Sequence, residues 1–224
     1  MNKKNNDSLW GHCFSASIFT FEIIIKSCII YTWGEKMFRN AKEEDADQIL
    51  PILFQIFDEM ELDVFKKVGD EKMAQVIKEG FFQPGYRYGL DNILVNEIDG
   101  KVVAIMVGYP EEAEDTIDEP LKKIMHKYGI KEDNLFGDKE AWPGEWYLDS
   151  FAVAPEFQGK GIGTATMEHF IEVIRERGEK ILSLNVDVDN APARHVYDKT
   201  GFKQVGQLYI GSHLYDHMQY DLTK

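Results

Sequence analysis

Three glycines in one short loop are the first residues of this sequence that could do chemistry. The segment Val153-Ala-Pro-Glu-Phe-Gln-Gly-Lys-Gly-Ile-Gly-Thr164 carries them at alternate positions from Gly159 to Gly163. A strand pattern precedes the loop and a helical pattern follows it. Glycines let successive backbone N–H groups turn toward one point, and the positive end of the next helix adds to them. The loop is therefore predicted to cradle a pyrophosphate.

The spacing of these glycines excludes two familiar phosphate loops. A P-loop requires G-x-x-x-x-G-K-[ST], whereas Lys160 precedes the last glycines here. A dinucleotide fingerprint requires G-x-G-x-x-G, whereas Thr164 takes the place of the third glycine when counting starts at Gly159. Neither of these nucleotide-binding folds is expected.

A second segment with chemical potential is Asn190-Ala-Pro-Ala-Arg-His-Val-Tyr-Asp-Lys-Thr-Gly-Phe202. Its Asn is a favourable N-cap, its Pro suits a first helical turn, and its Gly suits a helix end. This predicts a helix over 191–200 that presents Tyr197. His195 is on the same helix, two residues before Tyr197. Residues two apart do not share a helix face, so His195 should point away from the side of Tyr197 and is interpreted as structural.

Carboxylates on the strand before the glycine loop are candidate bases. Alternation along 146–153 is expected to place Tyr147, Asp149, Phe151 and Val153 on one face. A carboxylate at Asp149 could hold an ammonium group and accept its proton directly or through water. Glu145, at the head of the same strand, is the second candidate.

These two segments carry a family resemblance. Gln158-Gly-Lys-Gly-Ile-Gly163 is similar to the [QR]-x-x-G-x-[GA] coenzyme A signature of the GNAT superfamily of N-acetyltransferases. The segment 190–202 resembles the N-x-x-A-x-x-x-Y-x-x-x-G-F pattern near the end of that superfamily's core. The resemblance covers 37–224 and implies an α/β fold with a mixed, mostly antiparallel central sheet flanked by helices on both faces.

The resemblance also implies acetyl-coenzyme A as cosubstrate and assigns residues to it. Tyr197 would be the general acid near the thioester sulfur, and Asn190 would contact coenzyme A, although each could also serve only as packing or cap. Backbone groups of Phe151 and Val153 would meet the pantetheine arm. The pyrophosphate would be bound by the N–H groups around the loop, at Gln158, Gly159, Lys160, Gly161, Ile162, Gly163 and Thr164.

The sequence thus predicts transfer of an acetyl group to a primary amine of a small molecule or peptide, by direct attack in a ternary complex and without a metal. An alternative is an acyl-coenzyme A-binding sensor of the same fold without transferase activity. A third interpretation is a dimeric interaction domain organised by residues 1–36. The identity of the acceptor and the acyl length stay open at this stage.

The charge and cysteine content of the chain limit the kinds of molecule that it is expected to bind. Lys and Arg total 25 against 39 Asp and Glu, a formal charge of −14, so a nucleic acid is not expected to bind. The same charge would favour a cationic acceptor, although acidity for solubility is the plainer explanation. Cys13 and Cys28 are the two cysteines and have no metal-ligand spacing. We expect a cytoplasmic protein that does not enter a membrane.

The chain is expected to contain one domain at 37–224 after an N-terminal extension at 1–36. Charged residues interrupt the apolar run of the extension, which excludes a signal peptide or span. Asp99-Gly100 predicts a type I′ hairpin, and Pro51 should kink or delay its helix. The predicted strands are 38–40, 93–98, 102–108, 146–153, 181–187, 205–210 and 218–222, and the predicted helices are 44–59, 70–82, 121–128, 163–177 and 191–200.

Overall fold

The computed structural model describes residues 36–60, 62–131 and 136–224. The predicted N-terminal extension at 1–36 lies outside these residues except for Lys36, which begins the first strand. Residues 36–224 make up one compact unit. Within the described ranges, every helix is too short or too polar to span a lipid bilayer.

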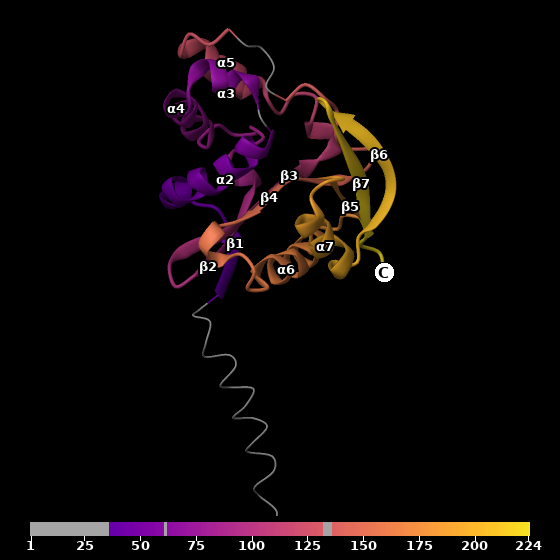
Figure 1. Cartoon of the computed structure of the whole chain (residues 1–224). Coiled ribbons are helices and arrows are strands. Elements are labelled where there is room, and N and C mark those ends of the chain that lie inside the picture. The colour runs from indigo at the N-terminus through magenta and orange to yellow at the C-terminus, as the bar shows by residue number, and fades with distance from the viewer. Residues whose placement is uncertain (1–35, 61, 132–135) are drawn as a thin grey trace, which may run out of the picture. The chain divides into compact units, whose positions relative to one another are not determined.

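A seven-stranded sheet forms the centre of this unit, in the order β1-β2-β3-β4-β5-β7-β6 (Figure 1). All neighbouring pairs are antiparallel except β4 and β5, which are parallel. The predicted mixed and mostly antiparallel sheet is therefore confirmed. The strands are β1 Lys36–Asn40, β2 Ile93–Ile98, β3 Lys101–Pro110, β4 Trp146–Val153, β5 Ile181–Asp187, β6 Lys203–Ile210 and β7 His213–Asp221.

The turn between β2 and β3 has the predicted type I′ geometry. Asp99 has φ 52° and Gly100 has φ 76°, so both central residues are in the left-handed region. Such a turn matches the twist of the strands that it joins. The hairpin fixes β3 as the strand against which β4 pairs.

Helices cover both faces of the sheet, as expected. Each of the five predicted helices is present, and α2 begins at Ala46, before Pro51, so Pro51 does not delay the start of the helix beyond itself. A short helix, α3, was not predicted. The helices are α2 Ala46–Met60, α3 Asp63–Val68, α4 Asp70–Gly80, α5 Glu119–Lys127, α6 Ile162–Glu176 and α7 Ala191–Thr200.

Alternation along β3 divides the core between the two faces. Ile105 and Val107 pack with apolar side chains of α2, α3, α4 and α5. Met106 packs with side chains of α6, α7, β5 and β7 instead. Because successive residues of a strand point to opposite faces, one strand joins both cores. β4 lies beside β3 and can therefore carry a different set of residues to each face.

The parallel strands β4 and β5 pair only at their first residues. Their register runs from Trp146 opposite Leu182 to Leu148 opposite Leu184. Beyond Leu148, β4 stays paired with β3 on its other edge, while β5 stays paired with β7. The edge of β4 that faces β5 is therefore free of strand partners from Asp149 onward.

A one-residue irregularity in β4 changes the expected facing of its side chains. Ser150 lies opposite Val107 and Leu148 lies opposite Gly108, which leaves Asp149 as an extra residue. Such a bulge re-aims the residues around it. The prediction that residues 147, 149, 151 and 153 share one face is therefore wrong. Tyr147 packs with Tyr109 and Ile117, whereas Phe151 packs in the core under α6.

Candidate active site

The glycine loop has the backbone geometry that an anion cradle requires. Gly159 has φ 70° and Gly161 has φ 76°, and no atom lies within 4 Å of a Cβ built on either residue. Gly161 is the N-cap of α6 and offers no side-chain cap. Ala165 N–H donates to the Gly161 carbonyl at 3.2 Å, so the three N–H groups before it have no acceptor within the helix. These groups are available to a bound anion.

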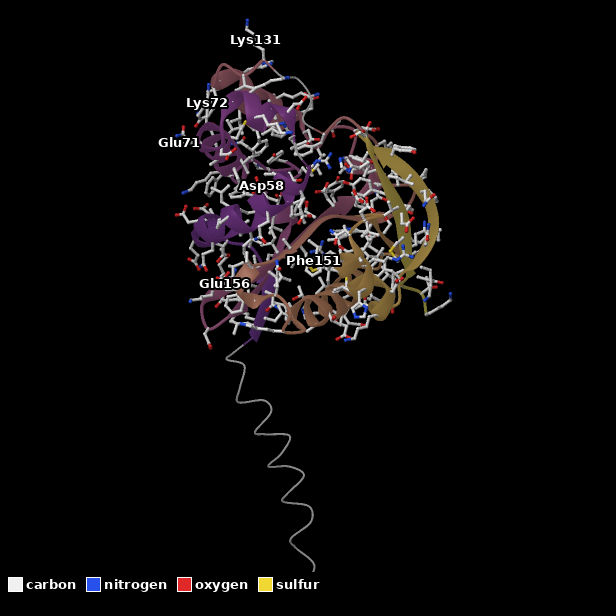
Figure 2. The ribbon with its side chains drawn as sticks, viewed as in Figure 1. Asp58, Glu71, Lys72, Lys131, Phe151 and Glu156 are labelled. Carbon is white, nitrogen blue, oxygen red and sulfur yellow. The ribbon has the colours of Figure 1, made fainter. Side chains whose placement is uncertain are left out.

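Two side chains of the loop hold the loop itself. Gln158 Nε2 donates to the Val153 carbonyl at 2.9 Å, and Lys160 Nζ donates to the Glu156 carbonyl at 2.7 Å. Gln158 and Lys160 thus connect the loop to the end of β4 and to the turn at Glu156, labelled in Figure 2. The backbone of the loop is left to contact the ligand.

The free edge of β4 presents backbone groups next to this loop. Ala154 N–H donates to the Val103 carbonyl at 2.9 Å, toward β3. By alternation, the peptide groups of Val153 and Phe151 point away from β3, toward the gap beside β5. Phe151 is labelled along β4 in Figure 2. This is the orientation that the prediction for Phe151 and Val153 requires.

Helix α7 brings the predicted Asn and Tyr to the same side of the gap. Asn190 Oδ1 accepts from Ala193 N–H at 3.1 Å, so Asn190 is the predicted N-cap. Gly201 ends the helix with φ 104°. Tyr197 is 7% exposed, and burial raises its pKa above the ordinary value. No described residue forms a hydrogen bond with its hydroxyl, which lines the pocket described next.

A pocket of about 530 Å³ opens between β4, β5, α2 and α7. Asp149, Phe151, Asn190 and Tyr197 are among its lining residues, so the structure brings four of the sequence-predicted residues together. The glycine loop does not line this pocket. It lies at the far end of the same free β4 edge, so the glycine loop and the pocket are separated along one strand.

Asp149 is held by three donors. Arg87 Nη1 and the Tyr109 hydroxyl, the latter at 2.8 Å, both donate to Asp149 Oδ1. The Ser150 hydroxyl donates to Oδ2 at 2.8 Å. Arg87 is 1% exposed and also forms an ion pair with Asp118 at 2.9 Å. Asp149 therefore lines the pocket as the partner of a buried guanidinium.

Glu140 is a pocket carboxylate that the sequence interpretation did not identify. It is 8% exposed, and burial, with the negative charge of Asp149, raises its pKa to about 7. The Tyr147 hydroxyl donates to Glu140 Oε2 at 2.6 Å. A carboxylate with a pKa close to neutral is suited to exchange protons with a substrate.

Glu145 is outside the pocket. It is 2% exposed, and its Oε1 contacts His217 Nε2 at 3.0 Å. Trp142 N–H donates to its Oε2 at 2.9 Å. Burial would raise the pKa of Glu145, but the bond with His217 and the Trp142 N–H lower it overall. The structure does not bring this predicted base to the pocket.

Little in the sequence could have identified Arg87 and Glu140. Glu140 lies in an irregular segment before β4, where no periodicity specifies burial. Arg87 lies in the loop between α4 and β2 and is 62 residues away from its partner Asp149. The one signal in the sequence was that Arg87 and Glu140 stand among aromatic residues. Charged residues that are buried in such surroundings need a partner.

Among the described residues, no group of three or more His, Cys, Asp or Glu side chains is placed to hold a metal ion. Of the pocket carboxylates, Asp149 is bonded by Arg87 and by the hydroxyl groups of Tyr109 and Ser150.

Comparisons with known proteins agree with this geometry. The profile of the acetyltransferase (GNAT) family matches residues 53–202. A crystal structure of an acetyltransferase is 42% identical with a TM-score of 0.75 and covers 83% of this chain and 99% of its own. An N-acetyltransferase from Staphylococcus aureus Mu50 is 27% identical with a TM-score of 0.73, covering 82% of this chain and 100% of its own.

A curated relative is similar over a shorter stretch. Streptothricin acetyltransferase from Streptomyces lavendulae is 42% identical over 75 residues, which are 32% of this chain and 40% of that protein. The chain thus matches less than half the length of this relative. The family profile, in contrast, spans α2 to the end of α7 and includes the glycine loop and Tyr197. With the fold and the loop geometry, that match shows that the chain belongs to the acetyltransferase (GNAT) family.

Proposed function

We propose that this protein transfers an acetyl group from acetyl-coenzyme A to a primary amine of a small molecule or peptide. The observation that carries the proposal is the placement of the Tyr197 hydroxyl and the Glu140 carboxylate on the wall of one pocket. One group can give a proton and the other can take one. The pocket lies beside the free edge of β4, which leads to the anion loop.

The residues described fit acetyl-coenzyme A. We assign the pyrophosphate to the N–H groups from Gln158 to Thr164 and the pantetheine arm to the backbone of Phe151 and Val153. Asn190 caps α7 and lines the pocket, so it would contact the coenzyme where the arm enters. Acetyl-coenzyme A supplies the activated acetyl carbonyl and a thiolate leaving group.

The chemistry requires two proton movements. The amine nitrogen bonds to the acetyl carbon while the carbon–sulfur bond breaks. A proton leaves the nitrogen for a pocket carboxylate, and Tyr197 gives a proton to the sulfur. Burial raises the pKa of Tyr197, so the phenol carries its proton at neutral pH.

Two pocket carboxylates compete for the base role. Asp149, predicted from the sequence, is neutralised by Arg87 and accepts from two hydroxyl groups. Glu140 accepts from one phenol, and its pKa is about 7. A base whose pKa is near the working pH is the more effective one. We therefore assign the base to Glu140 and assign Asp149 to the orientation of Arg87 and the pocket wall.

A thiol-release assay tests the proposed function. The purified protein is mixed with acetyl-coenzyme A and a panel of amines, and free coenzyme A is followed with a thiol reagent. The proposal expects release that depends on an amine and formation of the acetylated amine by mass spectrometry. Thermal stabilisation by coenzyme A without release for any amine would instead support the acyl-coenzyme A sensor.

A further inference from the structure

The acceptor pocket contains more negative charge than one amine requires. Five of its lining residues are carboxylates, namely Glu59, Glu140, Asp149, Asp187 and Asp189. The basic residues that line it are Arg87 and His213. Because a concave site concentrates the field of its own charges, this pocket attracts cations.

Neither basic residue cancels that charge. Arg87 is already neutralised, since it pairs with Asp149 and with Asp118. His213 is half-exposed and contacts Asp187 Oδ2 at 3.3 Å. This leaves Glu59, Glu140 and Asp189 without a positive partner among the pocket residues.

Two acids lie beside different positions of β5. Asn185 Nδ2 donates to the Glu140 carbonyl at 3.1 Å and to the Tyr147 hydroxyl at 3.0 Å, which fixes Glu140 beside Asn185. Asp187 follows two residues later on the same face of β5, and the β5–β7 register has no irregularity there. Two strand residues span about 7 Å, so Asp187 lies about that far along β5 from Asn185, beside which Glu140 is fixed.

Two tyrosines support a ligand between these acids. The Tyr197 side chain is 7% exposed and lines the pocket, and no described residue forms a hydrogen bond with its hydroxyl, so a ligand or water in the pocket would satisfy this group. Tyr215 lines the same pocket, and burial, with the charges of Asp187, Glu140 and Glu59, raises its pKa. These three acids therefore line one pocket together with Tyr197 and Tyr215.

We infer that the acceptor is a short, flexible diamine or polyamine. Its reacting amine is held at Glu140 beneath Tyr197, and its second ammonium group is bound at the rim by Asp187 and Asp189. The inference rests on the proposed acetyl transfer and adds the substrate class. It makes Asp187 a specificity residue, because this carboxylate contacts only the part of the acceptor that does not react.

Two probe amines of equal length test the inference. With acetyl-coenzyme A in excess, kcat and KM are measured for 1,4-diaminobutane and for 4-aminobutan-1-ol, in which a hydroxyl replaces one ammonium group. The kcat/KM for the diamine is expected to exceed that for the amino alcohol by tenfold or more, on the order of one charge-assisted hydrogen bond.

Two variants distinguish the effect of Asp187 at the pocket rim from the general effect of removing one negative charge. In the native protein the Asp189 N–H donates to Asp187 Oδ1 at 2.8 Å. The amide oxygen of the Asp187→Asn variant can still accept this bond. The substitution should raise KM for the diamine about tenfold and leave the amino alcohol unchanged. Glu172→Gln makes the same charge change on the exposed side of α6, outside the pocket, and should alter neither substrate. Melting temperatures identify any variant that fails to fold.

Several results would overturn the inference. If 4-aminobutan-1-ol is used as well as the diamine, the rim does not select a second cation, although the proposed function stands. An equal loss for both amines in Asp187→Asn has the same meaning. If neither amine supports thiol release but another amine of the panel does, the substrate class is wrong. Absence of release with every amine contradicts the proposed function itself.

Discussion

The Tyr147 hydroxyl donates to Glu140 Oε2 at 2.6 Å and accepts from Asn185 Nδ2 at 3.0 Å. The chain of contacts continues through Asn185 Oδ1 to His217 Nδ1 at 2.6 Å and from His217 Nε2 to Glu145 Oε1 at 3.0 Å. These linked polar groups thus fix the position of the Glu140 carboxylate. Glu145 is placed to orient Glu140 through this chain, at a distance from the acceptor.

Replacement of Glu140 by Gln should remove the base and keep the bond from Tyr147, because the amide oxygen can accept it. We expect kcat to fall by about 10²–10⁴-fold. In the native enzyme, kcat should decline below pH 7, since the pKa of Glu140 is about 7 and its protonated form cannot accept a proton. A pH–rate profile of both proteins checks this, and an unchanged profile in Glu140→Gln would assign the base elsewhere.

Glu140→Gln should lower kcat, but at pH 8 it should raise the stability of the folded protein. The pKa of Glu140 is raised on folding from its ordinary value of 4.5 to about 7, so the folded state binds the extra proton between these pH values. Its contribution to stability is therefore present below pH 4.5 and lost as pH rises through 7. At pH 8, Glu140→Gln should unfold at a higher denaturant concentration than the native protein, which urea titrations at pH 5 and 8 would show.

Tyr197→Phe should lower turnover by about 10²–10⁴-fold and leave coenzyme A binding intact, since a general acid contributes mainly in the transition state. Its hydroxyl has no described partner, so its removal should not lower the melting temperature. Tyr220→Phe is the matched control, because the Tyr220 hydroxyl accepts from Arg175 at 3.3 Å and does not line the pocket. Full activity of Tyr197→Phe would exclude it as the acid.

Gly161→Asp should abolish the thermal stabilisation by coenzyme A, because a carboxylate would stand at the anion cradle. Gly178→Asp controls for backbone strain, since Gly178 has φ 87° at the other end of α6 and Gly161 has φ 76°. Both variants should lose about 1–2 kcal/mol of stability, but Gly178→Asp should keep its response to the ligand. Differential scanning fluorimetry with and without millimolar coenzyme A separates the two, and retention of the response in Gly161→Asp would contradict the cradle.

Asp149→Asn leaves the buried Arg87 with one carboxylate instead of two. Breaking a buried pair costs about 3–5 kcal/mol, so a large fall in the melting temperature is expected. Asp118→Asn removes the other partner of Arg87, which does not line the acceptor pocket. If Asp149 were the base, its variant alone would lose turnover that higher pH restores, through deprotonation of the amine in solution.

A truncated chain, Met37–Lys224, should fold and bind coenzyme A. Its first residues form β1, which pairs with β2 from Met37 opposite Glu97 to Asn40 opposite Leu94. Circular dichroism and the coenzyme A thermal shift of the truncated protein would check this boundary. An unfolded product, beside a folded full-length chain, would place residues 1–36 within the core.

The sequence predicted the elements that carry local signals. β4, β5 and α7 begin and end at the predicted residues, because β-branched runs, an Asn cap and a terminal Gly specify them locally. The glycine loop was predictable for the same reason, as its chemistry is contained in consecutive residues. Helix α2 continues through Pro51, and the buried apolar residues on one of its faces stabilise it despite the lost hydrogen bond.

The acceptor side of the site could not be predicted in this way. Arg87, Glu140 and Asp149 meet through contacts between segments far apart in the chain, and each is unremarkable in its local sequence. A bulge also leaves no pattern in a strand whose residues on both faces are apolar or buried. The assignment of Asp149 assumed regular alternation, which the bulge at Asp149 interrupts.

The extra residue in β4 also makes the strand intolerant of changes in length. Tyr147, before the bulge, belongs to the acceptor side, and Phe151, after it, belongs to the face under α6. Deletion of Asp149 would restore regular alternation and rotate one of these two segments by half a turn. The residues proposed to contact the acceptor and those proposed to contact coenzyme A could then not both keep their positions. Relatives that use a different acceptor are therefore expected to differ by substitutions or in the flanking loops, with the length of β4 unchanged.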